Sequence, residues 1–172
     1  MKRLWLVIVF GLTACTGIPE GIEPVENFEL EPYLGTWYEI ARLDHRFERG
    51  LSNVTATYSL RDDGGVNVVN RGYRADKGEW DEANGKAFFV DAPDVGRLKV
   101  SFFGPFYGAY NVFELGNNYE YSLVAGPDRS YLWILGRAPE LPPKLLDELI
   151  GKAAAAGFDT SELIIVEHDD AR

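Results

Sequence analysis

Short apolar and aromatic runs alternate with turn-forming residues over most of the chain. Between Leu34 and Arg137, eight such runs follow one another at near-even spacing, and turn sequences such as RDDGG at 61–65 separate them. Asp and Gly tolerate the positive φ angles that tight hairpin turns require. Many short strands joined by tight turns are typical of an all-β sandwich or barrel. The predicted strands span residues 35–44, 53–60, 66–74, 79–90, 96–103, 107–115, 119–125 and 130–137.

The pattern changes after the eighth predicted strand. Between positions 142 and 157, Leu, Ile and Ala residues recur at the spacing of an α-helix. Two prolines begin this segment and Gly157 ends it, which suits the two ends of a helix. A further short strand is predicted over 161–168. We expect the helix to pack its apolar stripe on the outer face of the sheet, since aliphatic residues there need a cover.

The two faces of the predicted sheet differ in chemistry. Successive side chains of a strand point to opposite sides, so an inward Trp37 places Glu39, Ala41 and Leu43 on the same side. The same counting groups Trp133 with Arg137 on the last strand. This predicted interior mixes aromatic and polar groups, whereas a solid core would consist of aliphatic residues and Phe. Mixed walls favour a ligand cavity, and an eight-stranded barrel is wide enough for one small ligand.

Eight residues are candidates for ligand contact on this basis. Tyr107 and Trp133 are placed nearest the middle of a strand or the open end, and packing in a core explains both equally well. Glu39 and Asn111 would meet a polar headgroup or bond to other structural groups. A one-residue bulge would reverse any of these assignments. The full set is Tyr107, Trp133, Tyr121, Phe88, Val90, Asn111, Phe113 and Glu39.

Several arginines follow the first predicted strand. Arg42, Arg46 and Arg49 would attract a phosphate or carboxylate in an otherwise acidic protein. The alternative is a solvated loop in which Asp44 and Glu48 pair with them.

The N-terminal segment has the features of a secretory signal. Lys2 and Arg3 precede an apolar stretch over 4–12, which is shorter than the ~20 residues of a membrane-spanning helix. The sequence LTAC at 12–15 resembles the lipobox of bacterial lipoproteins, in which the Cys is acylated and the peptide is cut before it. Cys15 is the only cysteine, so it cannot form an intramolecular disulfide. A plain signal peptide or a short membrane anchor is the alternative.

The lipobox resemblance divides the chain into four parts. Residues 1–14 are the predicted lipoprotein signal peptide, 15–30 a lipidated tether rich in Pro, Gly and Glu, 31–168 the folded domain and 169–172 a tail. Residue 16 is Thr instead of the Asp that retains such lipoproteins at the inner membrane. The resemblance therefore implies a lipid anchor in the outer membrane, on its periplasmic side.

The acidic charge of the chain excludes several classes of partner. The formal net charge is −10, and loss of Lys2 and Arg3 with the signal peptide takes it to −12. Nucleic acids require clusters of Lys and Arg. Anionic headgroups repel an acidic surface, so membrane attachment has to come from the acyl chains. No cofactor or metal is predicted, because His45 and His168 are the only histidines, and no carboxylate pair or nucleophile motif marks an enzyme.

The first and last strands of the predicted barrel carry a family resemblance. Gly35-x-Trp37 on the first strand and Arg137 after YLWILG on the last resemble the first and third conserved regions of the lipocalins. Longer stretches, including YLGTWYEIARLDHRFERGL and LKVSFFGPFYGAYNVFEL, are similar to bacterial outer-membrane lipoprotein lipocalins and apolipoprotein D. The second lipocalin motif, T-D-Y, is only approximated by GNNYEY at 116–121, so no role is transferred to its asparagines.

The resemblance implies an eight-stranded antiparallel up-and-down barrel with one closed end and a C-terminal α-helix packed outside. Gly35, Trp37 and Arg137 are then structural residues that close the barrel, with the guanidinium on the indole face. Bacterial members of this kind are associated with fatty acids and lysophospholipids, so storage or transport of such a lipid in the envelope is the predicted function. The alternative is an envelope scaffold or interaction lipoprotein with a filled barrel and no small-molecule ligand. The sequence does not decide whether the protein forms a homodimer.

Overall fold

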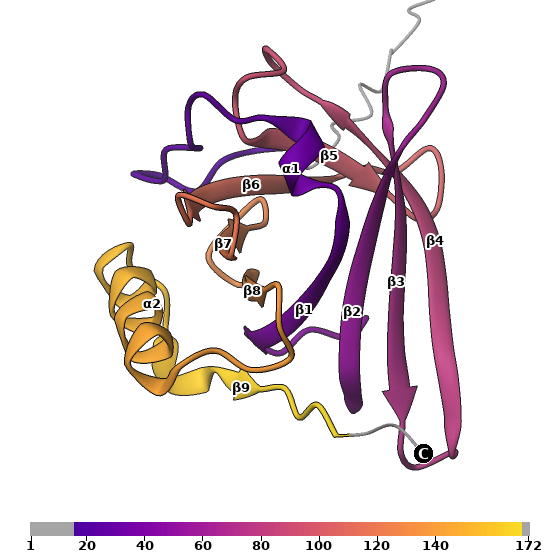
Figure 1. Cartoon of the computed structure of the whole chain (residues 1–172), viewed down its shortest axis with the longest axis vertical. Helices are drawn as coiled ribbons and strands as arrows, with labels where there is room; N and C mark the ends of the chain where they lie inside the picture. Colours follow the sequence, from indigo (N-terminus) through magenta and orange to yellow (C-terminus); the bar gives the residue numbers. More distant parts are fainter. Residues whose placement is uncertain (1–15, 170–172) are drawn as a thin grey trace, which may run out of the picture.

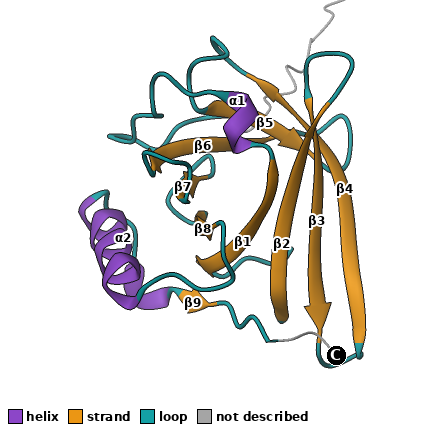
Figure 2. Cartoon of the chain, in the orientation of Figure 1, coloured by secondary structure: helices purple, strands orange, loops and turns teal. Residues whose placement is uncertain are grey.

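The chain folds into an antiparallel β-barrel with a helix on its outside (Figure 1). The computed structural model describes residues 16–169. A short helix α1 (Leu30–Tyr33) precedes the barrel, and helix α2 (Pro143–Ala155) follows it (Figure 2). No helix of this described part is both long and apolar enough to cross a membrane. The barrel strands are β1 (Gly35–Arg42), β2 (Leu51–Leu60), β3 (Val66–Arg74), β4 (Glu79–Phe89), β5 (Arg97–Ser101), β6 (Gly108–Leu115), β7 (Tyr121–Ala125) and β8 (Leu132–Gly136).

The predicted fold class is confirmed by the way the strands pair. Each strand pairs antiparallel with the next, and β1 closes the barrel by pairing with both β2 and β8. Strands β2, β3 and β4 run side by side as a tall wall, with α2 on the far side of the barrel (Figure 1). Within the described residues, β5 pairs with β4 only from Lys86 to Phe89. The barrel is therefore open along the first part of β4.

The C-terminal segment fills a gap between the first two strands. Pairing between β1 and β2 extends from Gly35 to Tyr38 on β1, and β9 (Ile164–Ile165) pairs with the end of β1 instead. The Asn53 N–H donates to the Glu167 carbonyl over 2.8 Å, which joins the segment to β2. The strand predicted over 161–168 is thus much shorter, because residues 160–162 form a 3₁₀ turn.

Buried apolar side chains form two clusters, one on each side of the sheet. We call the first the interior cluster; its fully or nearly buried members come from all eight strands and from the segment before β1. They are Phe28, Tyr33, Trp37, Tyr58, Val66, Val68, Ala87, Leu98, Val112, Val124 and Leu135. We call the second the helix-side cluster, because it joins α2 to the outer faces of β1, β7 and β8. It contains Ile22, Ile40, Ala41, Leu43, Leu123, Ala125, Leu132, Ile134, Leu149, Ala153 and Phe158.

The segment before β1, which is part of the tether predicted over 15–30, is packed against the barrel. The Val25 N–H donates to the Val112 carbonyl, and the Gly96 N–H donates to the Val25 carbonyl, both over 2.8 Å. Phe28 is only 3% exposed. These contacts fix the chain around Val25 to β6 and to the loop before β5. The predicted signal peptide, Cys15 and the last three residues of the predicted tail lie outside the described residues.

Candidate functional site

The closed end of the barrel is formed by Trp37 and Arg137, which make the contact that the sequence predicts. The Arg137 Cζ atom lies 3.9 Å from the centre of the Trp37 ring. Its guanidinium donates to the carbonyls of Thr36 (2.9 Å), Tyr119 (3.3 Å) and Pro32. The Trp37 indole N–H donates to the Tyr33 carbonyl over 2.8 Å. Each donor nitrogen here has a backbone acceptor, so this end can hold its shape without a ligand.

Gly35 allows the chain to enter β1 beside this pair. Its φ angle is +91°, a left-handed conformation that favours glycine. A Cβ atom built on it would lie 3.6 Å from an Arg137 guanidinium nitrogen. The backbone conformation, more than lack of space, therefore explains the glycine.

Three tyrosines and a serine form a hydrogen-bonded group above the closed end. The Tyr110 hydroxyl lies 2.7 Å from the Tyr33 hydroxyl and 2.9 Å from the Tyr58 hydroxyl, and Ser122 Oγ lies 3.1 Å from Tyr33. Burial raises the pKa of Tyr33 to about 12. The hydroxyls thus stay neutral and satisfy one another, while their rings face the interior.

A charged group lies in the interior nearer the open end. Arg42 is 1% exposed, and its guanidinium donates to Glu39 Oε1 over 2.7 Å and to the Glu48 carbonyl over 2.8 Å. The pairing register of β1 with β8 shifts between Glu39 and Ala41. This bulge turns both Glu39 and Arg42 inwards, although they are three positions apart. The prediction that Ala41 and Leu43 share the inner face with Trp37 is therefore wrong, and both belong to the helix-side cluster.

Glu48, in the loop after β1, connects the charged group to an indole. Its Oε2 atom accepts a hydrogen bond from the Trp133 ring N–H over 3.0 Å and lies 2.9 Å from His45 Nε2. The His45 and Trp133 rings meet edge to face, with centres 5.2 Å apart. We call Glu39, Arg42, His45, Glu48 and Trp133 the mouth cluster. It combines two carboxyl groups, one guanidinium, one imidazole and one indole.

The two carboxyl groups of the mouth cluster have opposite pKa shifts. Burial, together with the charge of Glu48, raises the pKa of Glu39 well above its ordinary value, although Arg42 opposes this. Burial also acts to raise the pKa of Glu48, but hydrogen bonds from His45 and Trp133 hold it below its ordinary value. One carboxyl therefore tends to keep its proton while its neighbour is ionised, which is typical of coupled buried acids.

The structure places two of the eight predicted contact residues, Glu39 and Trp133, in the interior. Three others face outwards, and the interior position predicted for them is wrong. Asn111 donates to the carbonyls of Gly17 and Gly126 over 3.2 and 3.1 Å. The Phe113 ring stacks on Phe158 at 5.7 Å, and Tyr121 packs on the helix-side cluster.

These outward positions have a physical cause. Strands β6 to β8 pack on the interior on one side and on α2 or the N-terminal segment on the other, so both of their faces are apolar. Alternation then shows which residues share a face but not which face is inside. The interior residues of β6 are Tyr110 and Val112, the alternates of those predicted.

The last three predicted contact residues also lie off the interior. Phe88 alternates with the interior residues Ala87 and Phe89 and so points outwards. Val90 lies just beyond the end of β4 and belongs to neither cluster. Tyr107 precedes β6, and Lys99 Nζ lies 5.2 Å from the centre of its ring. His45 and Tyr110 are the site residues that sequence reasoning missed. Arg42 and Glu48 were considered only as an anion site or a solvated loop, and their burial was not predicted.

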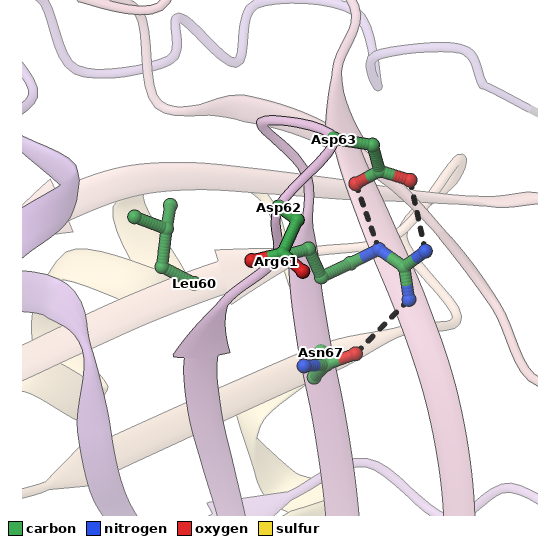
Figure 3. Close-up of a pocket in the computed structure, with 5 residues that line it drawn as sticks. All are labelled: Leu60, Arg61, Asp62, Asp63 and Asn67. Atoms are coloured by element: carbon green, nitrogen blue, oxygen red, sulfur yellow. Dashed lines mark hydrogen bonds and ion pairs between the residues drawn. The ribbon is translucent and has the colours of Figure 1, made fainter.

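Two surface hollows lie towards the closed end. The first, of about 370 Å³, is formed at the β2–β3 turn by Leu60, Arg61, Asp62, Asp63 and Asn67 (Figure 3). Arg61 there donates to both Asp63 oxygens, over 2.9 and 2.8 Å, and to Asn67 over 3.0 Å. The charge of the Arg61 guanidinium is thus paired within the turn. The second hollow, of about 400 Å³, is lined mainly by Leu30, Leu34, Leu60, Phe89 and Pro93. Neither hollow contains a residue of the mouth cluster.

The barrel, its closed end and its outer helix define a class of small β-barrel proteins, and comparison with known proteins identifies the family. The lipocalin-like domain family matches residues 28–168. Insecticyanin from the tobacco hornworm Manduca sexta has the same fold, with a TM-score of 0.71 at 20% identity over 91% of this chain and 89% of that one. The chain belongs to the lipocalin family.

Relatives with more than half of their aligned residues identical are bacterial lipoproteins. The outer membrane lipoprotein Blc of Vibrio cholerae is 54% identical over 97% of this chain and 99% of its own length. The protein of the same name from Escherichia coli K12 is 56% identical over 92% and 90%. Bovine apolipoprotein D is 33% identical over 83% and 78%. These relatives support the lipid-anchored outer-membrane localisation predicted from the N-terminus.

Proposed function

We propose that the protein carries a single-chain amphiphile, a fatty acid or lysophospholipid, inside its barrel. The observation that supports this most directly is the division of the interior along the barrel axis. Towards the closed end the interior residues are aliphatic or aromatic, and their few hydroxyls bond to one another. Towards the open end lies the mouth cluster, with a buried guanidinium and an imidazole. A single-chain amphiphile also has an apolar part, its acyl chain, and a polar part, its head, so it matches this arrangement of the interior.

Partial exposure of some interior residues supports an accessible space. Ala56, Val100, Tyr110 and Trp133 pack with the interior cluster and yet are half-buried, whereas Val112 and Val124 are fully buried. Each methylene that leaves water on such a surface contributes about 0.8 kcal/mol. A long acyl chain would therefore bind without covalent chemistry, with its head near Arg42 and His45.

Native mass spectrometry tests this proposal. The soluble domain, residues 16–172, is mixed with palmitate or with a lysophospholipid, and saturable one-to-one binding is expected, together with a change in tryptophan fluorescence. Absence of both signals would contradict the carrier proposal and favour the alternative of a filled barrel that acts as an envelope scaffold.

A pair of neighbouring substitutions locates the ligand. Ala56 belongs to the interior cluster, while Thr57 points to the outer face, where its hydroxyl lies 3.1 Å from that of Thr36. An Ala56→Trp variant should fill the space and weaken binding at least about tenfold, or ~1.4 kcal/mol. A Thr57→Trp variant should bind as the wild type does. Equal binding by both variants would show that the ligand does not occupy the barrel.

A further inference from the structure

The loop between β5 and β6 carries two strongly exposed aromatic side chains. Phe103 is 74% exposed and Phe106 is 69% exposed. The Phe106 N–H donates to the Phe103 carbonyl over 3.1 Å, so the backbone between them forms a closed turn. A turn held in this way presents both rings to the surroundings. Exposed apolar groups of this size usually mark a contact surface.

This loop lies at the open end of the barrel. In an up-and-down barrel, every second loop lies at the same end, so the β5–β6 loop is at the same end as the β1–β2 loop. That loop carries Phe47, which is 60% exposed and has the Arg46 guanidinium 5.2 Å from its ring centre. Three exposed phenylalanines therefore border the opening.

Basic side chains lie beside the two phenylalanines, although the protein is acidic overall. Lys99 lies over the Tyr107 ring, and Lys86 is exposed on β4, opposite the last residue of β5. Among the described residues, no carboxylate lies within ion-pair distance of Lys86 or Lys99. Lysine, tyrosine and exposed phenylalanine together are typical of protein surfaces at a membrane–water interface.

The start of the described chain is fixed to the same face of the barrel. The Thr16 carbonyl accepts a hydrogen bond from the Arg97 guanidinium over 3.1 Å, and Thr16 follows Cys15 directly. Arg97 and Lys99 share the outer face of β5, because Leu98 between them belongs to the interior cluster. From Arg97 to the end of β5 at Ser101 is ~13 Å at the usual rise of a strand.

We propose that the loop 102–107 contacts the bilayer beside the acyl anchor and turns the open end of the barrel towards the membrane. Phe103 and Phe106 enter the interfacial region, and Lys86 and Lys99 lie at the level of the phosphates. The anchor at Cys15 alone would fix only a point, whereas anchor and loop together fix an orientation. This inference rests on the predicted acylation of Cys15 but not on the proposed ligand.

Spin labelling of the acylated protein tests the orientation. Since the sole natural cysteine carries the anchor, a Phe103→Cys variant has one free thiol for a nitroxide. Leu60→Cys is the matched control, because Leu60 is 58% exposed and lies at the closed end. The vesicles contain three parts phosphatidylethanolamine to one part phosphatidylglycerol. We expect several-fold more collisions with oxygen, relative to a water-soluble nickel chelate, at position 103 than at position 60.

Three results would overturn the proposal. Equal accessibility of the two labels to the nickel chelate would show that the loop stays in water. Broadening of the spectrum by a second label at position 103 would show that another copy of the chain covers the loop. A mature protein whose mass lacks the acyl groups would remove the anchor on which the orientation depends.

A transfer measurement separates this inference from ligand binding. In a double variant with Phe103→Ser and Phe106→Ser, uptake of a lysophospholipid from vesicles should be several-fold slower, while binding of the same lipid dispersed in solution should be unchanged. The Leu60→Ser variant should match the wild type in both. If binding in solution falls as well, the loop belongs to the ligand site instead of a membrane contact, and the proposal is wrong.

Discussion

The two ends of the barrel each contain an arginine, but they use it differently. At the closed end, Arg137 lies on the Trp37 ring and donates only to backbone carbonyls. Towards the open end, Arg42 donates to the Glu39 carboxyl group and to the carbonyl of Glu48, whose own carboxyl group helps to raise the pKa of Glu39. Backbone carbonyls do not titrate, whereas carboxyl groups do. The closed end is therefore insensitive to pH and the open end is not.

This contrast distinguishes polar groups that only stabilise the barrel from polar groups that can respond to a proton or a ligand. A guanidinium bound by carbonyls has no partner that a ligand could replace without breaking the backbone arrangement. A guanidinium bound by a side chain has a partner that can be protonated or displaced. We expect substitutions at the closed end to act on stability and those at the open end to act on pH dependence and binding.

Loss of Trp37 should have the largest effect. Trp37 is fully buried, and a Trp37→Ala variant should lose about 3–5 kcal/mol in free energy of unfolding, since large-to-small changes in a core leave a cavity. Trp80→Ala is the matched control, because the Arg71 guanidinium lies 3.9 Å from the Trp80 ring, the same distance as in the closed-end pair. Trp80 is half-buried on the outer face, so its loss should cost about 1 kcal/mol. Denaturant unfolding measures both, and equal losses would contradict a special role of the closed end.

Much of the fold follows from local sequence signals. The β3 bounds agree with the predicted 66–74, and the helix and the other barrel strands differ by a few residues at their ends. Turn residues and hydrophobic periodicity are local, so one sequence can show them. The closing role of Gly35, Trp37 and Arg137 came instead from the resemblance of their motifs to those of the lipocalins.

The interior of the barrel could be predicted only in part. The bulge after Glu39 reverses the faces of β1, and nothing in GTWYEIARL marks its position. On β6 and β7, the packing of α2 and of the N-terminal segment makes the outer face as apolar as the inner one. That choice of face depends on tertiary packing far along the chain. It explains why Asn111, Phe113 and Tyr121 were placed inside and Tyr110 was not.

The second-largest effect should be a pH dependence of the free energy of unfolding that comes from Glu39. Its folded-state pKa is raised by burial, so the folded protein binds this proton more tightly than the unfolded chain does. The resulting stability is complete below about pH 4 and is lost as the pH rises through the folded-state pKa. A Glu39→Gln variant does not titrate there, so its stability relative to the wild type should increase with pH, by about 1.4 kcal/mol for each unit of the shift. Unfolding free energies measured between about pH 5 and pH 8 test this.

The Glu48→Gln variant provides a control of opposite sign. The pKa of Glu48 is lowered in the folded protein, so its contribution is present at neutral pH and is lost as the pH falls through the folded-state value. This variant should be less stable than the wild type at neutral pH, and the difference should shrink on acidification. Parallel curves for the two variants would show that the carboxyl groups are not coupled in the way described.

The smallest effect should come from removing one hydrogen bond of the mouth cluster. In Trp133→Phe, Glu48 loses the indole donor at 3.0 Å while most of the aromatic packing remains, so we expect a loss of about 1 kcal/mol in unfolding free energy. The pKa of Glu48 should move back towards its ordinary value, because the indole is one of the groups that lower it.

Tyr121→Phe is the matched control on the outer face, where the hydroxyl makes only a long bond of 3.4 Å to Glu114. If lysophospholipid binding weakens in Trp133→Phe and not in Tyr121→Phe, the open end contributes to recognition. An equal change in both variants would mean that the mouth cluster is as purely structural as the closed end.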